Sequence, residues 1–564
     1  MEALDWLVIG VFFLALIGII VWVVRQKQND SADYFLGGRD ATWLAIGASI
    51  FASNIGSEHL IGLAGAGASS GMAMAHWEIQ GWMILILGWV FVPFYSRSMV
   101  YTMPEFLERR YNPQSRTILS VISLVSYVLT KVAVTVYAGG LVFQQVFGIK
   151  ELWGIDFFWI AAIGLVVLTA LYTIFGGMKS VLYTSVLQTP ILLLGSLIIL
   201  VLGFKELGGW DEMMRVCGAV TVNDYGDTMT NLIRSNDDAN FPWLGALIGS
   251  AIIGFWYWCT DQFIVQRVLS GKNEKEARRG TIFGAYLKLL PVFLFLIPGM
   301  IAFALHQKYI GAGGEGFLPL LANGTANADA AFPTLVAKLL PAGVKGLVVC
   351  GILAALMSSL ASLFNSSAML FTIDFYKRFK PETPEKKLVG IGQIATVVIV
   401  ILGILWIPIM RSVGDVLYTY LQDVQSVLAP GIAAAFLLGI CWKRTSAKGG
   451  MWGLIAGMII GLTRLGAKVY YSNAAVTDSS MFKYLFYDLN WLFFCGWMFL
   501  FCIVVVIVVS LMTEAPSAEK IQGLVFGTST PEQKAATRAS WNHWDIIHTV
   551  IILAITAAFY WYFW

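Results

Sequence analysis

Polar residues interrupt two long apolar segments of this chain, and their chemistry suits the binding of an ion and a small polar solute. Residues 52–59 (Ala-Ser-Asn-Ile-Gly-Ser-Glu-His) lie inside an apolar run from Trp43 to Leu63, and residues 254–262 interrupt a second run at 242–266. Glycine loosens a helix, and Ser and Asn side chains compete for its backbone hydrogen bonds. We therefore predict two broken helices whose free carbonyls lie at membrane depth, as in secondary transporters, with a structural kink as the alternative for either one alone.

Several ionisable side chains fall inside apolar segments, where an isolated charge is costly and partners are expected. They are Glu58, His59, His76, Glu78, Lys131, Asp261, Lys288 and Asp374. Glu78 and Lys288 are the most informative, because a carboxylate and an ammonium that meet would neutralise each other and offer an acceptor and a donor to sugar hydroxyls. A purely structural pair or a proton relay is the alternative.

Neutral polar and aromatic residues accompany these charges. Asn54, His59 and Gln422 add donors and acceptors for the rim of a polyhydroxylated ring, and aromatic residues could cover its C–H face. The aromatic candidates are Trp77, Tyr257, Trp258 and Tyr418. Most of the 21 Trp residues are expected to face lipid or the membrane interface.

A pair of serines suggests where an ion could bind. Ser358 and Ser359 lie mid-span without an acidic neighbour, and such hydroxyls usually bond back to the preceding helical turn. If the freed carbonyls of Ala52 and Ile55 face them, these groups and the Ala355 carbonyl would offer about five neutral oxygens, a set that suits sodium.

Composition defines the class of protein that must position these groups. The chain has 564 residues, 58% of them hydrophobic and 13% charged, which is about half the charged fraction of a soluble protein. This indicates an all-α, polytopic membrane protein in a lipid bilayer. The net charge of +3 gives no reason to expect nucleic acid, and the N-terminal apolar run is long enough to be a retained helix.

The apolar runs predict about fourteen transmembrane helices. They lie near 5–24, 41–65, 74–95, 117–147, 155–175, 181–203, 242–266, 281–305, 344–373, 387–410, 414–440, 450–467, 490–511 and 544–564. Most of the 37 Lys and Arg residues fall in the cytoplasmic loops if both termini are outside.

The spans divide into units within one transport domain, 1–564. A leading helix and linker (1–40) precede two five-helix units, 41–203 and 242–410, each of which opens with a broken helix, and additional helices follow at 411–564. Because each unit has an odd number of spans, the two have opposite orientations and form an inverted repeat.

Several stretches together resemble the solute:sodium symporter family, and within it the sodium/glucose cotransporters. They are Phe51–His59, Thr102–Glu105, Tyr257–Gln262 with Val265–Arg267, Gly284–Leu289, Ser358–Ser366, Tyr420–Gln422 and Trp442–Arg444 with Gly449–Gly450. The resemblance implies a leucine-transporter-type fold with a five-plus-five inverted repeat, which carries a hexose such as glucose or galactose inward with sodium by alternating access.

The family's functional residues fall on positions that the physical argument also selects. For the sugar they are Asn54, His59, Glu78, Tyr257, Trp258, Lys288 and Gln422; for the outer gate Leu63, Trp77 and Tyr418; for the inner gate Tyr257; for sodium Ala52, Ile55, Ala355, Ser358 and Ser359.

The sequence also departs from the family pattern. Ser185 and Ala361 stand where members that couple two sodium ions carry an Asp and a Thr, so one sodium per sugar is expected. Gly81 replaces a sugar-contacting serine of some bacterial members, and the few cysteines favour a bacterial inner membrane.

Other functions remain open at this stage. A sodium/myo-inositol symporter would use the same polar set, and a sugar-gated channel or sensor is a further alternative. An enzyme is disfavoured because the sequence has no metal, haem or nucleophile constellation. The preferred sugar and the oligomeric state do not follow from the sequence.

Overall fold

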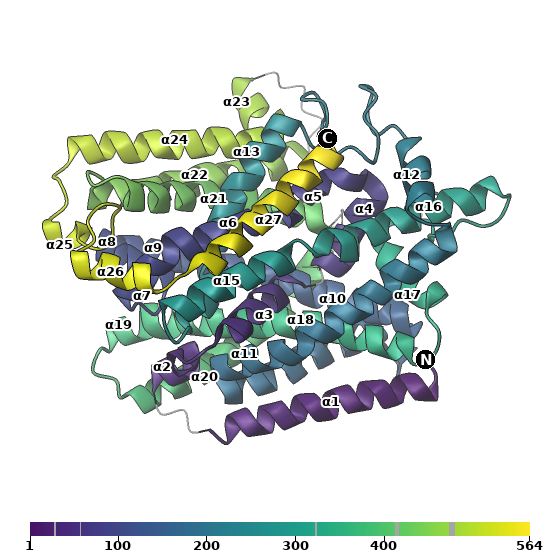
Figure 1. The fold of residues 1–564 in the computed structure, drawn as a ribbon, viewed down its shortest axis with the longest axis horizontal. Helices are drawn as coiled ribbons and strands as arrows, with labels where there is room; N and C mark the ends of the chain where they lie inside the picture. The colour runs from purple at the N-terminus through teal and green to yellow at the C-terminus, as the bar shows by residue number, and fades with distance from the viewer. Residues whose placement is uncertain (27–29, 57, 322–323, 412–416, 473–479) are drawn as a thin grey trace.

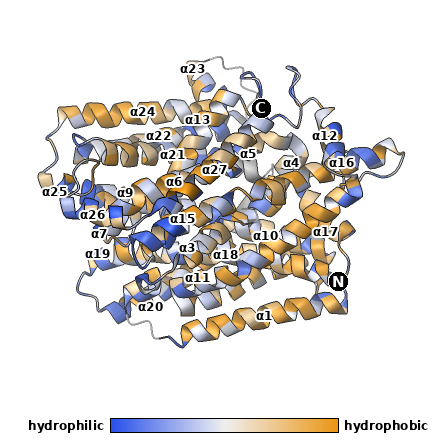
Figure 2. Cartoon of the chain, in the orientation of Figure 1, coloured by the Kyte–Doolittle hydropathy of each residue, from blue (hydrophilic) through white to orange (hydrophobic). Residues whose placement is uncertain are grey.

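The chain is almost entirely helical (Figure 1) in a computed structural model that describes residues 1–26, 30–56, 58–321, 324–411, 417–472 and 480–564. Eleven helices of the described part are long and apolar enough to cross a membrane. Apolar residues cover the middle of these helices, and polar residues gather at the two ends of the bundle (Figure 2). This is the pattern of a polytopic membrane protein.

The first part of the chain contains a leading helix and then many short helical pieces. Their bounds are α1 (Ala3–Val24), α2 (Ser31–Leu36), η1 (Gly37–Arg39), α3 (Trp43–Asn54), η2 (Glu58–Leu63), α4 (Ala64–Ser70), η3 (Gly71–Met74), α5 (Ala75–Glu78), α6 (Gly81–Ile86), η4 (Leu87–Phe91), α7 (Val92–Ser98), α8 (Met103–Arg110), α9 (Pro113–Ser126), η5 (Tyr127–Val132), α10 (Ala133–Phe147), α11 (Phe157–Leu207) and α12 (Trp210–Gly218). The strands β1 (Glu151–Leu152) and β2 (Ile155–Asp156) pair antiparallel between α10 and α11.

The second part opens with α13, a helix of 12 residues. The bounds are α13 (Trp243–Gly254), η6 (Phe255–Thr260), α14 (Gln262–Leu269), α15 (Glu274–Lys288), η7 (Val292–Leu296), α16 (Ile297–Gly311), η8 (Ala328–Ala330), α17 (Ala331–Leu339), α18 (Val344–Met369), η9 (Leu370–Tyr376), α19 (Lys377–Phe379), α20 (Glu385–Arg411), α21 (Leu417–Cys441), α22 (Ala447–Ser472), α23 (Met481–Lys483), η10 (Tyr484–Asp488), α24 (Trp491–Met512), α25 (Ala518–Ile521), α26 (Pro531–Ala539) and α27 (His543–Tyr562).

The first predicted break is present. Helix α3 ends at Asn54, Ile55 is extended, and a π-helix begins at Glu58. Among the described residues, no backbone N–H bonds to the carbonyls of Ala52 or Ile55, whereas Ile55 donates to the Phe51 carbonyl. The break therefore leaves two buried carbonyls available, as the sequence predicted.

The second predicted break is present as well. The α-helical part α13 runs to Gly254 and is followed directly by the π-helix η6. The break comes at Asp261, whose backbone is extended and whose side chain caps α14. The Asp261 N–H bonds to the Trp256 carbonyl, five residues back. Tyr257 and Trp258 thus lie on a widened helical turn, a feature that often marks functional sites.

The predicted runs at 155–175 and 181–203 are both helical and form the two arms of α11, which meet at a kink. A straight helix of its 51 residues would be roughly 76 Å long, more than twice the bilayer core. It bends at Gly177, whose φ is 52° and whose added Cβ would lie 2.4 Å from the Tyr34 carbonyl oxygen. Only glycine meets both demands comfortably, so α11 can cross the membrane twice.

The helices that carry the candidate residues pack around α3. Helix α3 lies against α11, α15 and α18, while α21, α22 and α24 pack on one another and also contact η2, η6 and α13. The last helix, α27, crosses in front of α6 and α15, and both chain termini lie toward the same end of the bundle (Figure 1).

Candidate functional site

One cavity of about 60 Å³ lies between the two broken helices. Nine of the residues predicted from the sequence line it: Asn54, His59, Trp77, Glu78, Tyr257, Trp258, Lys288, Ser359 and Gln422. The predicted polar and aromatic residues are therefore together in space although they come from distant parts of the chain.

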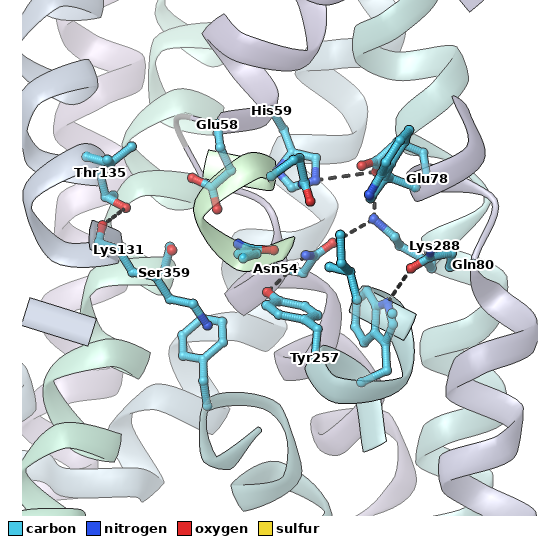
Figure 3. A pocket seen from close by; sticks show the side chains of 18 of the residues that line it. Asn54, Glu58, His59, Glu78, Gln80, Lys131, Thr135, Tyr257, Lys288 and Ser359 are labelled. Carbon is cyan, nitrogen blue, oxygen red and sulfur yellow. Dashed lines mark hydrogen bonds and ion pairs between the residues drawn. The ribbon is translucent and has the colours of Figure 1, made fainter. Parts of the chain in front are cut away.

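A buried ion pair forms the centre of this site (Figure 3). The Lys288 ammonium donates to Glu78 Oε2 at 2.6 Å and to Asn54 Oδ1 at 3.1 Å. Each of the three residues is the last of its helix, α15, α5 and α3. Glu78 and Lys288 are only 1% and 3% exposed, so each charge depends on the other as its main partner.

Polar contacts connect this ion pair to both broken helices. His59 Nε2 lies 3.4 Å from Glu78 Oε2, and the Asn54 amide donates to the Tyr257 hydroxyl at 3.1 Å. One chain of polar contacts thus joins the first broken helix, α5, α15 and the second broken helix (Figure 3).

Two glutamines that the sequence analysis missed belong to the same cavity. Gln80 accepts from the Trp258 indole at 3.2 Å and donates to the Ser250 carbonyl at 2.8 Å. Gln425 lines the cavity beside Gln422, whose amide oxygen has no hydrogen-bond partner among the described side chains. The signal for Gln80 was its position two residues after Glu78 in an apolar run.

The predicted outer-gate residues differ in their position relative to the cavity. Trp77 lines the cavity and stacks on Trp491 of α24, with ring centres 5.6 Å apart, and Phe241 meets it edge-on at 6.2 Å. Leu63 is fully buried and is not part of the cavity lining. The side chain of Tyr418 lies outside the described residues.

The C-terminal helices brace the segment that carries Trp77. Besides the stacking by Trp491, His76 Nδ1 lies 2.9 Å from the hydroxyl of Tyr560 in α27. The other ring nitrogen of His76 bonds to the Leu232 carbonyl at 3.1 Å. Two helices from the additional C-terminal part therefore support one wall of the site.

The residues predicted to bind sodium are all buried at the contact between α3 and α18. Ala52, Ile55, Ala355, Ser358 and Ser359 are each at most 2% exposed, and Ser359 also lines the cavity. The Ser53 and Ser362 hydroxyls meet at 2.6 Å and hold the end of α3 against α18. Neutral carbonyl and hydroxyl oxygens fit a monovalent cation better than calcium.

The predicted place of a second ion is occupied by neutral groups. The Ser185 hydroxyl donates to the Val181 carbonyl of its own helix at 2.6 Å and lies 3.3 Å from the Ser358 hydroxyl. Ala361 is fully buried and offers no side-chain oxygen.

Most of the other charges predicted within the membrane have partners. Lys131 lies 2.6 Å from Asp261, and Arg116 lies 2.7 Å from Asp374. Glu58 lines the cavity, and one of its carboxylate oxygens is buried without a hydrogen-bond partner among the described residues.

The geometry defines a transporter built on two broken helices, and comparison with known proteins identifies its family. Residues 34–457 match the Sodium:solute symporter family, so the chain belongs to that family. It is 37% identical over 542 residues to the sodium/myo-inositol cotransporter 2 of Mus musculus, covering 94% of this chain and 80% of that one. It is 35% identical over 537 residues to the sodium/glucose cotransporter 4 of Danio rerio, covering 92% and 80%.

Its fold is shared with a solved symporter. A substrate-bound, outward-open Na⁺-coupled sialic acid symporter matches with a TM-score of 0.73 at 22% identity, covering 92% of this chain and 99% of that one. The predicted all-α, leucine-transporter-type fold is confirmed, while the number of fourteen spans stays a prediction. The protein is a multi-pass, sodium-coupled symporter rather than an enzyme.

The Glu78–Lys288 pair yields a test by double substitution. Lys288→Met leaves the Glu78 carboxylate buried without its cation, so we expect a loss of about 3–5 kcal/mol of stability. Glu78→Gln combined with Lys288→Met removes both charges and should recover most of that loss. Thermal unfolding in detergent measures the difference, with Lys272→Met on the surface as the control. A double variant that melts as early as the single one would contradict the coupling.

Proposed function

We propose that this symporter carries a polyhydroxylated six-membered ring into the cell together with sodium. The cluster of Asn54, Glu78 and Lys288 beside Trp258 is the main support. The Lys288 ammonium makes two of its three possible hydrogen bonds within the cluster, and the Glu78 carboxylate has further lone pairs. The cluster is therefore stable by itself and still has capacity for solute hydroxyls.

The solute we propose first is a hexose such as glucose or galactose. His59 and Gln422 would serve further hydroxyls, and the faces of Tyr257 and Trp258 would cover the apolar side of the ring. myo-Inositol is the second candidate, because a cyclitol presents hydroxyls around a ring of similar size. The names of the relatives from mouse and zebrafish support both.

Sodium is proposed to bind between the first break and α18, at the carbonyls of Ala52, Ile55 and Ala355 and the hydroxyls of Ser358 and Ser359. This assignment gives a physical basis for coupling, because Asn54 and His59 belong to the same break. An ion that orders the break also orders the solute-binding groups, so each ligand raises the affinity for the other.

One sodium per solute is the stoichiometry we propose. Ser185 and Ala361 provide no charge for a second ion, and the Ser185 hydroxyl bonds within its own helix.

Alternating access would follow from movement of the two halves. We propose that 41–203 and 242–410 are the inverted repeats, with 1–40 leading and 411–564 as additional helices. Leu63, Trp77 and Tyr418 would close the outer side, and Tyr257 would move aside to release the solute inward.

Orientation and membrane are proposals of the same kind. The Lys- and Arg-rich loops favour a cytoplasmic side opposite both termini, and the termini lie toward one end of the bundle (Figure 1). The six cysteines are free thiols, which fits a bacterial inner membrane.

Flux measurements in proteoliposomes test the function. Labelled glucose, galactose and myo-inositol should each be offered with and without an inward sodium gradient, while sodium entry is measured in parallel. We expect hexose uptake to require the gradient and one sodium to enter per sugar. Preferred uptake of myo-inositol would identify the second candidate, and a variable ratio of ion to solute would indicate a channel.

Two substitutions should separate the ion site from the solute site. Ser359→Ala removes one oxygen and should raise the sodium concentration for half-maximal uptake about fivefold. Gln422→Ala should raise the sugar requirement about fivefold, since one hydrogen bond contributes about 1 kcal/mol. Ser367→Ala, elsewhere on α18, is the matched control. Unchanged sodium dependence in Ser359→Ala would show that the ion binds elsewhere.

Antibody access tests the orientation. An epitope added after Trp564 should be recognised on intact spheroplasts, whereas one inserted at Lys272 should be recognised only after permeabilisation. The reverse pattern would invert the proposed topology.

A further inference from the structure

A second buried ion pair, which the proposed function does not use, joins the two halves of the chain. The ammonium of Lys131 in η5 lies 2.6 Å from the carboxylate of Asp261. The two side chains are 10% and 2% exposed, and Lys131 lines the same cavity as Tyr257 (Figure 3). This pair connects the helix at 113–147 with the second broken helix.

Asp261 is the residue at which that helix breaks. Its backbone is extended between η6 and α14. Its Oδ2 accepts from Lys131, and its Oδ1 accepts from the hydroxyl of Tyr127, one turn before Lys131. The Tyr127 hydroxyl in turn accepts the Phe263 N–H at 3.0 Å. Two side chains of one helix therefore fix both oxygens of Asp261 and the start of α14.

Lys131 also holds the ring of Tyr257. Its ammonium lies 4.8 Å from the ring centre of Tyr257 and 4.7 Å from that of Phe263, on the two sides of the break. A cation over an aromatic face is attractive, more so when water is excluded. Tyr257 is thus held at its hydroxyl by Asn54 and at its face by Lys131.

We propose that the Lys131–Asp261 pair is a latch that keeps Tyr257 in its closed position, with Lys131 and Tyr127 as positioning residues. This inference rests on the proposed role of Tyr257 as the inner gate. Inward movement of Tyr257 requires η6 to shift, and that shift pulls Asp261 away from Lys131. Separating the two charges at membrane depth is costly, so the latch suppresses opening of the unloaded carrier.

The native Cys259 offers a direct reporter of the latch. It lies in η6 between Tyr257 and Asp261, is fully buried, and its thiol contacts the Met83 carbonyl at 3.6 Å. Loosening of η6 should expose it to N-ethylmaleimide. The experiment uses full-length protein in proteoliposomes with Cys441→Ser, because Cys441 is exposed, and peptide mass spectrometry follows the labelling of Cys259.

Breaking the pair should speed labelling. We expect Lys131→Met and Asp261→Asn each to raise the rate at least about fivefold, the lower end of typical coupling between conformational states. Lys131→Arg should keep the slow rate, and the exchange Lys131→Asp with Asp261→Lys should return toward it. Arg279→Gln, which breaks the pair of Arg279 with Asp545 between α15 and α27, is the control and should stay slow.

Unchanged labelling in both neutral variants, or an exchange variant as fast as the single ones, would overturn the latch. If the neutral variants do not accumulate, Tyr127→Phe removes only the hydroxyl that holds Asp261. The proposal requires faster labelling in that variant, and an unchanged rate contradicts it. Because labelling needs no solute, it tests the latch even if neither labelled hexose nor myo-inositol is transported, a result that would overturn only the proposed function.

Discussion

The Lys288 ammonium, the Glu78 carboxylate and the Asn54 amide satisfy one another in an interior where none of them could remain alone. Their meeting requires three helices to end at one point. A continuous helix through residues 43–70 would not end at Asn54 or leave the carbonyls beside it free. The broken helix is therefore a condition for the cluster, and the cluster in turn fixes where the break can be.

The same contacts connect the proposed ion and solute sites. Asn54 reaches Lys288 on one side and Tyr257 on the other, while its neighbour Ser53 bonds to Ser362 of α18. A conformational change at the first break therefore directly alters contacts with the ion-pair cluster, with α18 and with the second break. Short-range coupling of this kind is what a symporter needs.

Much of the site could be predicted because polar residues are conspicuous in apolar segments. This applies to Asn54, Glu78 and Lys288, and the family resemblance then selected the same aromatic residues as the physical argument. The sequence analysis assigned no partner to Lys131 or Asp261, so their contact, and the hydrogen bond between Gln80 and the Trp258 indole, emerged only from the structure.

The fold was predictable to a similar degree. Apolar runs predicted the all-helical class and both breaks, because span length and helix-breaking residues are local properties. The two arms of α11 were predicted as separate spans, which agrees with the kink at Gly177. The positive φ of Gly177 and its close approach to the Tyr34 carbonyl could not be predicted, because they depend on tertiary packing. Leu63 was expected at the outer gate from the family resemblance; it is fully buried and is not among the residues that line the cavity.

The bracing of residues 75–78 by α24 and α27 has a practical consequence. Trp491 covers one face of the Trp77 indole, and Tyr560 engages the His76 imidazole. A shortened protein that ends after Arg411 would lose both contacts. Trp77 and His76 would then have no support from the C-terminal helices. Efforts to shorten this protein for fusion or crystallisation should therefore trim elsewhere and retain its last two long helices.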